Sequence, residues 1–212
     1  MLCLTDIEIE LKKRLAYKYV WYRKQNDLWD SYSNFIYQTK YWDALIPQIA
    51  KGVSDNQLDK KEFFYYTINR WYNFWSAVAV EFIFSELPQV VPQKNRKDRL
   101  VDFALQGIKF DHKTTRFPNR YKHSLNYAKN NPKDLIQWLY THQSNQQRRH
   151  FDNRLFIVVY ANNGEHWKLK SEISWLKDII STYVTKFDDA KLTKLQLQPH
   201  KVTYAGLIWA IK

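Results

Sequence analysis

Two strand-like runs separated by only two residues constrain this chain more than any other feature. They lie in residues 100–115, LVDFALQGIKFDHKTT, where apolar and polar side chains alternate on both sides of Gln106 and Gly107. A two-residue turn at Gln106 and Gly107 makes these runs the strands of a β-hairpin. In that register Asp102 stands opposite Asp111, so we expect two carboxyl groups to meet on one face of the hairpin.

A cation between the two opposed acids would relieve their mutual repulsion. Opposed Cβ atoms in a hairpin lie about 4.5–5.5 Å apart, and like charges at that distance repel each other. The repulsion raises the pKa of one acid or recruits a cation. Lys113 lies one step along the same face, too far out to neutralise both acids. Mg²⁺ takes carboxylate oxygens and keeps several waters, so we predict a Mg²⁺ site at Asp102 and Asp111, in which Mn²⁺ can substitute.

Two other interpretations of the hairpin stay open. Gln-Gly is not a preferred two-residue turn, and a longer loop would shift the pairing. Asp and Lys also serve as surface charges that protect an edge strand from aggregation. That interpretation leaves the opposition of Asp102 and Asp111 uncompensated. The ring of His112 points to the apolar face, where we expect a hydrogen-bonded core histidine rather than a ligand.

The rest of the chain predicts a mixture of helices and strands. Apolar residues recur at helical spacing through residues 6–51, with an expected end near Gly52, and again through residues 55–87. After Pro92, short β-type runs alternate with helical segments. This order predicts an α/β (α+β) fold with a central mixed β-sheet flanked by helices.

The sequence also suggests how the chain is divided. We expect an aromatic-rich helical N-terminal region over residues 1–60, packed on a core formed by residues 61–212. Aromatic residues make up 17% of the chain and hydrophobic residues 45%, which implies a well-filled core.

Charge and cysteine content limit which partners, cross-links and metal sites this protein can have. The net charge of +12 predicts attraction to a polyanion, most commonly nucleic acid. Cys3 is the only cysteine, which excludes an intrachain disulfide and a cysteine-based metal cluster. No uncharged apolar run reaches the length of about 18 residues that a spanning helix needs, and the first residues lack a signal-peptide pattern. We therefore expect a cytoplasmic protein without a membrane segment.

The sequence VDF, followed by a short hairpin and FDHK, resembles the PD-(D/E)xK nuclease superfamily, which has the restriction-endonuclease-like fold. The superfamily pattern is an acid at the end of one strand, then Asp or Glu, any residue and Lys on the next. Asp102, Asp111 and Lys113 match these positions, whereas Val101 stands in place of the proline. The resemblance covers residues 69–161, including a helix before the hairpin and a helix–strand–helix run after it.

The resemblance implies metal-dependent hydrolysis of phosphodiester bonds. It implies that Asp102, Asp111 and the main-chain carbonyl of His112 hold Mg²⁺. It also implies that Lys113 holds the attacking water and offsets charge that develops on the phosphate.

The superfamily often adds an acid from the helix before the hairpin. Glu81 matches that position and is expected to contact the metal or a metal-bound water. An exposed or lysine-paired Glu81 stays open as the alternative. Glu86 is the rival acid, nearer the helix end beside Pro88.

Two basic stretches after the hairpin can contact nucleic acid. Arg and Lys neutralise phosphates, and Gln can read base edges. Arg116 is closest in sequence to Lys113 and is expected nearest the scissile phosphate. Each residue of these stretches can instead belong to a solvated charged loop. The predicted nucleic-acid contacts are Arg116, Arg120, Lys122, Gln143, Arg148, Arg149 and Arg154.

These features together predict a Mg²⁺-dependent DNA endonuclease with a restriction, defence, homing or repair role. Cleavage of duplex DNA needs two cuts, so we expect a homodimer. Two alternatives stay open: a non-catalytic nucleic-acid-binding protein with a nuclease-like fold, and a nuclease acting on RNA or single-stranded DNA.

Overall fold

The computed structural model describes residues 2–93, 101–142 and 151–212. The chain divides into two compact units. The first comprises Met1–Val80 with Lys170–Trp175, and the second comprises Glu81–Leu169 with Leu176–Lys212. The first unit therefore extends past residue 60, where the sequence analysis placed the boundary. Among the described helices, none is both long enough and apolar enough to cross a membrane.

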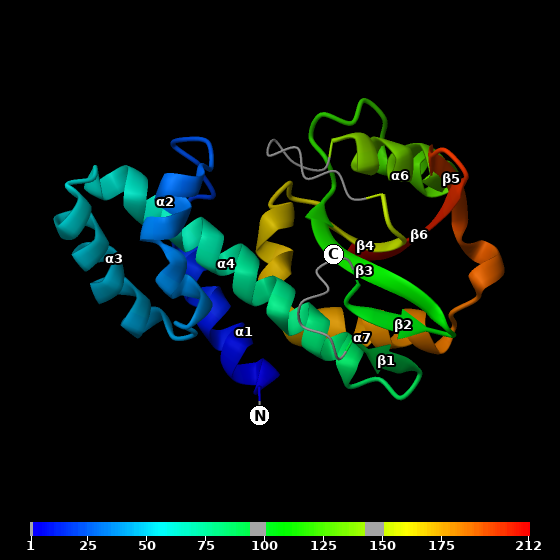
Figure 1. Ribbon diagram of the computed structural model, residues 1–212, viewed down its shortest axis with the longest axis horizontal. Coiled ribbons are helices and arrows are strands. Elements are labelled where there is room, and N and C mark those ends of the chain that lie inside the picture. Colours follow the sequence, from blue (N-terminus) through cyan, green and yellow to red (C-terminus); the bar gives the residue numbers. More distant parts are fainter. Residues whose placement is uncertain (1, 94–100, 143–150) are drawn as a thin grey trace. The chain divides into compact units, whose positions relative to one another are not determined.

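The first unit is helical in its described residues (Figure 1). Its largest buried side chains include Trp71, Tyr66, Tyr72 and Phe63, each at most 1% exposed. The elements of its N-terminal part are α1 (Leu4–Lys13), η1 (Arg14–Ala16), α2 (Asp27–Tyr32), η2 (Asn34–Tyr37), α3 (Trp42–Asn56) and α4 (Lys60–Ser85), of which α4 ends in the second unit.

Gly52 does not end a helix, contrary to the sequence-based expectation. Helix α3 continues through Gly52 to Asn56, and Gln57 ends it with a left-handed backbone conformation, φ 50°. A Cβ atom at Gly52 would lie 2.8 Å from Cε1 of Phe63. The glycine therefore allows α3 to pack closely against α4.

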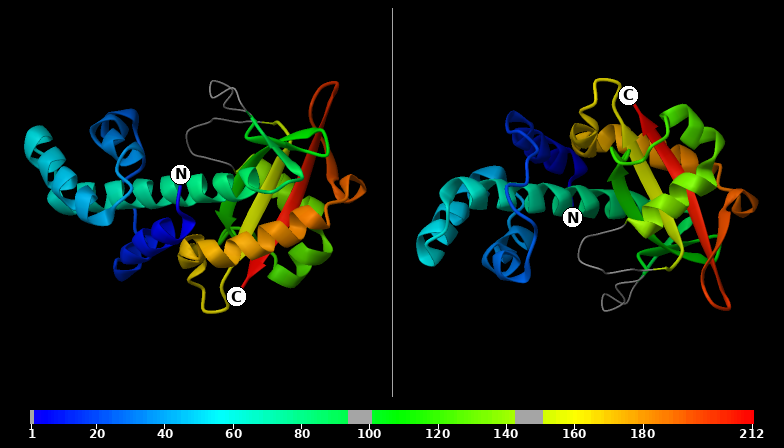
Figure 2. Two further views of the ribbon diagram at one scale, coloured as in Figure 1. Left: turned by 90° about the horizontal axis from the view of Figure 1, so that it is seen from below. Right: turned by 90° about the horizontal axis from the view of Figure 1, so that it is seen from above.

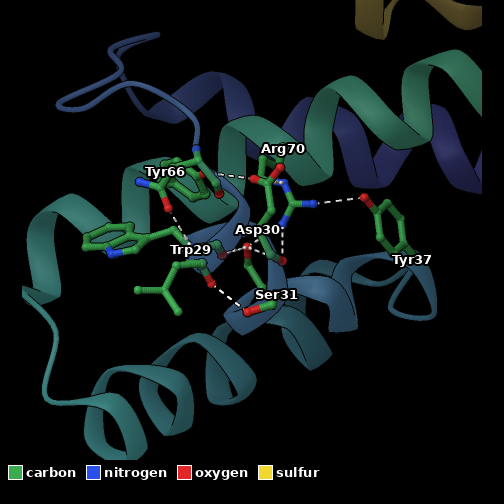
Figure 3. Close-up of polar contacts among 9 residues, drawn as sticks. Trp29, Asp30, Ser31, Tyr37, Tyr66 and Arg70 are labelled. Atoms are coloured by element: carbon green, nitrogen blue, oxygen red, sulfur yellow. Dashed lines mark hydrogen bonds and ion pairs between the residues drawn. The ribbon is translucent and has the colours of Figure 1, made fainter. Parts of the chain in front are cut away.

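A buried polar network joins α2 and η2 to α4 (Figure 3). Arg70 is 6% exposed, and its Nε lies 3.1 Å from Oδ1 of Asp30. Its Nη2 donates to the Tyr37 hydroxyl at 2.8 Å, and the Tyr66 hydroxyl donates to Oδ1 of Asp30 at 2.5 Å. Because its charge and donors are matched, Arg70 can be buried without a large desolvation penalty.

The second unit contains a six-stranded mixed sheet, which confirms the predicted fold class at that level. Its strands lie in the order β1-β2-β3-β4-β6-β5. Neighbours are antiparallel except for β3 with β4 and β4 with β6, which are parallel. The strands are β1 (Val90–Pro92), β2 (Phe103–Leu105), β3 (Ile108–Arg116), β4 (Arg154–Tyr160), β5 (Thr193–Gln198) and β6 (Lys201–Ile211).

Helices flank this sheet on both faces. Helices α6 and α7 lie on opposite faces of the sheet (Figure 2). Helix α6 is amphipathic and buries Leu135, Ile136, Leu139 and Tyr140. The helical elements of the second half of the chain are α5 (Leu125–Asn130), α6 (Pro132–Thr141), η3 (His166–Ser171), α7 (Ile173–Thr185) and η4 (Asp189–Lys191).

The β2–β3 hairpin has the predicted register. Phe103 pairs with Phe110 and Leu105 with Ile108, which leaves Gln106 and Gly107 as the turn. Both turn residues have positive φ, 49° and 80°. This is the requirement of a type I′ turn, whose twist suits a two-residue hairpin. The expected pairing from Phe103 to Ile108 is thus confirmed, even though glutamine is an unusual residue at the first turn position. The register ends at Phe103, and the N–H of Asp102 donates to the Phe110 carbonyl at 2.9 Å, so the expected pairing of Asp102 with Asp111 is not part of it.

Candidate active site

Successive side chains of strand β3 point to opposite faces of the sheet. Asp111 and Lys113 pair with Arg154 and Phe156 of β4 and share their face of the sheet. Phe156 packs in the hydrophobic cluster that includes the buried side chains of α6. His112 points to the opposite face, which the sequence analysis predicted.

Asp102 is bound to His112 through both the main chain and the ring. Oδ2 of Asp102 accepts the backbone N–H of His112 at 2.8 Å and lies 2.6 Å from its Nδ1. The ring is 6% exposed and lies beside Phe84 and Phe103, with centroids 5.9 and 6.5 Å away. His112 is therefore a buried, hydrogen-bonded histidine, as expected.

This contact shifts the pKa of both partners. Burial disfavours the charged form of Asp102, but its hydrogen bonds with His112 outweigh burial and hold its pKa below the usual value. Burial also disfavours charged His112, yet the hydrogen bond and charge of Asp102 outweigh it and raise the pKa of the imidazole. The geometry and both shifts describe a carboxylate–imidazolium pair.

Asp111 meets both Asp102 and a buried arginine. Oδ2 of Asp102 binds the N–H of His112, the residue that follows Asp111 in β3, and the two aspartates affect each other's pKa. Oδ2 of Asp111 accepts a short hydrogen bond from Nε of Arg154. Burial raises the pKa of Asp111, the charge of Arg154 opposes the shift, and the charge of Asp102 adds to it. The pKa of Asp102 is thus lowered, whereas the pKa of Asp111 is raised.

Glu81 belongs to the same electrostatic neighbourhood, although the residue is exposed. Partial desolvation of its carboxyl group and the charge of Asp102 raise the pKa of Glu81, while His112 lowers it. Solvent screens much of this interaction at an exposed position. Glu86 is also exposed and lies just after the end of α4. Of the two candidate acids, Glu81 is therefore the one that interacts with the aspartate pair.

Asp102 and the middle of β3 offer oxygen atoms of the kind that a hard cation binds. His112 and Arg154 both bind Oδ2 of their aspartates, so neither of these contacts uses an Oδ1 atom. The N–H of His112 points toward Asp102, and the N–H and C=O of one residue in a strand point the same way. The His112 carbonyl therefore lies on the Asp102 side of β3. Within the described parts of the chain, no group of three or more His, Cys, Asp or Glu side chains is arranged to hold a metal ion.

The predicted nucleic-acid contacts occupy different environments. Arg116 and Arg120 are exposed and line a pocket together with Lys113, and Lys122 is exposed outside it. Arg154 differs from the expectation: it is 5% exposed and pairs with Asp111 rather than lying on the surface. Gln143, Arg148 and Arg149 lie outside the described residues.

Two partners of the aspartates were not recognised from sequence. The pairing of Arg154 with Asp111 depends on the parallel register of β3 and β4, which a long crossover sets and local patterns do not reveal. The contact between His112 and Asp102 could have been predicted from the sequence. A histidine on an apolar strand face needs a hydrogen-bond partner, and Asp102 was expected on the neighbouring strand.

Comparisons of the chain with protein-family models, curated proteins and solved structures find no match.

Proposed function

We propose that this protein is a metal-dependent endonuclease of the PD-(D/E)xK type, which hydrolyses phosphodiester bonds in DNA. The observation that carries the proposal is the position of the Asp102 carboxylate, which binds the N–H of His112 next to Asp111 in β3, with Lys113 on the same face as Asp111. His112 and Arg154 already supply positive charge to Oδ2 of Asp102 and of Asp111. A metal ion would bind the Oδ1 atoms, which these two contacts do not use.

The order of elements supports the same assignment. Helix α4, which bears Glu81, precedes the β2–β3 hairpin, and α6, β4 and α7 follow it. This is the context in which the superfamily places its acids and lysine. We therefore assign the sheet of the second unit to the restriction-endonuclease-like fold.

The donor set fits Mg²⁺, which binds proteins through one or two carboxylates and completes its shell with waters and substrate phosphate oxygens. Asp102, Asp111 and the His112 carbonyl would hold the ion, with Glu81 reaching an ion-bound water. When bound there, Mg²⁺ supplies Lewis acidity toward the phosphate and lowers the pKa of a bound water.

The protein side chains have separate roles around that centre. His112 fixes the orientation of Asp102 through two hydrogen bonds. Arg154 holds Asp111 and offsets its charge. Lys113 orients the attacking water and offsets the charge that develops on the phosphate oxygens.

The distribution of charge favours nucleic acid as the substrate. Most of the net charge of +12 belongs to the second unit, which also contains the aspartate pair. Excess cations on the unit that carries the site attract phosphates to it. Because duplex cleavage needs two cuts, we propose that the protein acts as a homodimer.

The test is cleavage of supercoiled plasmid DNA by the wild-type protein and by Asp111→Asn. We expect nicking and linearisation with Mg²⁺, none in EDTA, and a loss of at least about a hundredfold in rate for the variant. Asp152→Asn is the matched control, because Asp152 is a nearby aspartate that pairs with Lys201 outside the site. It should cleave at the wild-type rate.

Other outcomes identify the competing functions. Cleavage that EDTA does not change would refute the metal mechanism. DNA binding without cleavage under any metal condition would identify a non-catalytic binding protein. Parallel assays with single-stranded DNA and RNA would show a nuclease of another substrate class if only those strands are cut.

A further inference from the structure

A pocket of about 380 Å³ opens on the sheet face that carries Asp111 and Lys113. Lys113 lines the pocket. Asp111 is two residues earlier on the same strand, which is about 7 Å along it. Ligand sites in proteins typically occupy roughly 300–1,000 Å³. The pocket thus has the volume of a small-ligand site and begins next to the proposed catalytic centre.

The inner side of the pocket is apolar and aromatic. Phe156 and Leu139, 1% and 6% exposed, are among its lining residues. Trp138 and His142, one helical turn apart, also line it and stack with ring centroids 4.1 Å apart and planes 14° from parallel. Nδ1 of His142 lies 2.9 Å from the Trp138 carbonyl oxygen, which holds the imidazole in this orientation. His142 is exposed, so this stack reaches the pocket surface.

The outer side of the pocket is cationic. Lys113 and Arg116 from β3 and Arg120 from the following turn contribute positive charge, and Asn119 adds an amide. An aromatic wall beside several cations matches the two chemical parts of a nucleotide. Aromatic rings stack with any base, and Lys and Arg neutralise phosphate.

We propose that this pocket binds one unpaired nucleotide of the substrate strand, with its base against the Trp138–His142 stack and its phosphate toward Lys113 and Arg116. The inference rests on the proposed nuclease function and adds the state of the substrate. A base that stacks on a protein ring has left the base stack of a duplex. The nucleotide beside the scissile phosphate is therefore either single-stranded or turned out of the duplex.

The test measures binding in EDTA, where no cleavage interferes. The probes are fluorescent oligothymidylate and an abasic deoxyribose-phosphate oligomer of equal length, followed by anisotropy. His142→Ala should weaken oligothymidylate binding about tenfold, the size expected for loss of one base–aromatic contact. His142→Phe keeps a flat ring and should bind like the wild type. Because His142 is exposed, neither change threatens the fold.

The abasic oligomer isolates the role of the base. Wild type and both variants should bind it equally, because only its phosphates make contact. Gln137→Ala is the matched control on the same helix, since Gln137 is exposed and does not line this pocket. It should leave both affinities unchanged.

Two results would overturn the nucleotide pocket: an unchanged oligothymidylate affinity in His142→Ala, or an equal loss for both probes. Failure of the nuclease proposal would look different. It would appear as absent Mg²⁺-dependent cleavage by wild-type protein that still shows the base-dependent binding.

Discussion

Asp102 holds His112 at two atoms, because a single carboxylate oxygen contacts both the backbone N–H and Nδ1 of that residue. The ring of His112 lies among core aromatics, while its partner Asp102 interacts electrostatically with Asp111. The packing of the core and the geometry of the aspartate pair are therefore connected through one imidazole.

Replacing this histidine should cost stability without leaving a cavity. His112→Phe keeps an aromatic ring beside Phe84 and Phe103 but removes the partner of Asp102. We expect the free energy of unfolding to fall by about 2 kcal/mol near pH 5.5, the contribution of a hydrogen bond to a charged group. Urea denaturation measures the change, and an undiminished midpoint would show that the pair contributes nothing.

The same pair predicts a pH window for stability. The pKa of Asp102 is lowered, so its contribution is present above the ordinary value of 3.8 and is lost as pH falls through the folded pKa. The pKa of His112 is raised, so its contribution is present below 6.5 and is lost as pH rises through the folded pKa. The stability difference between wild type and His112→Phe should therefore be largest between these values and decline at lower and higher pH.

Removing Arg154 should destabilise the protein through Asp111. Arg154→Met keeps a long side chain beside Tyr140 and Phe156 but removes the charge that Asp111 faces. We expect a loss of about 2 kcal/mol at pH 7, because Asp111 is left partly buried without its cation. Adding Asp111→Asn to this variant should restore part of the loss, since no unpaired charge remains. Equal denaturation midpoints for the single and double variants would contradict this account.

The hairpin turn should control activity through register. Gly107→Ala places a Cβ at φ 80°, where no neighbouring atom lies within 4 Å, so the cost is backbone strain of about 1 kcal/mol. Strain at this turn should displace Asp102 relative to Asp111 and lower the plasmid cleavage rate about tenfold.

Gly164 offers a matched control for this turn. It has the same φ of 80° and equally open surroundings. Gly164→Ala should lose similar stability by thermal denaturation yet cleave at the wild-type rate. Equal loss of activity in both variants would show that the effect comes from general stability rather than from hairpin register.

The sequence predicted local features better than long-range ones. Alternation around Gln106 and Gly107 was enough for the hairpin register, because adjacent strands with a two-residue turn have only one close pairing. Strands β1 (Val90–Pro92) and β5 (Thr193–Gln198) were missed. The first has only three residues, and the second, TKLQLQ, is too polar to stand out from a loop.

The closeness of Asp102 and Asp111 could be expected from the sequence, but their counter-charges could not. Asp102 and Asp111 belong to one hairpin, so their proximity is a local property. Arg154 reaches Asp111 only after the chain passes through α5 and α6 and returns parallel to β3. No local pattern distinguishes an arginine that will enter a sheet from one in a basic loop, which is why Arg154 was expected among the surface cations.

Side chains of two kinds alternate along strand β3. Phe110 and the ring of His112 are buried among aromatic side chains, whereas Asp111 and Lys113, which we propose as site residues, alternate with them along the strand. In a mutational scan along this strand, the effect should therefore alternate from one position to the next. Substitutions at the buried positions should reduce the yield of soluble, folded protein. Substitutions at the positions between them should give folded but inactive protein.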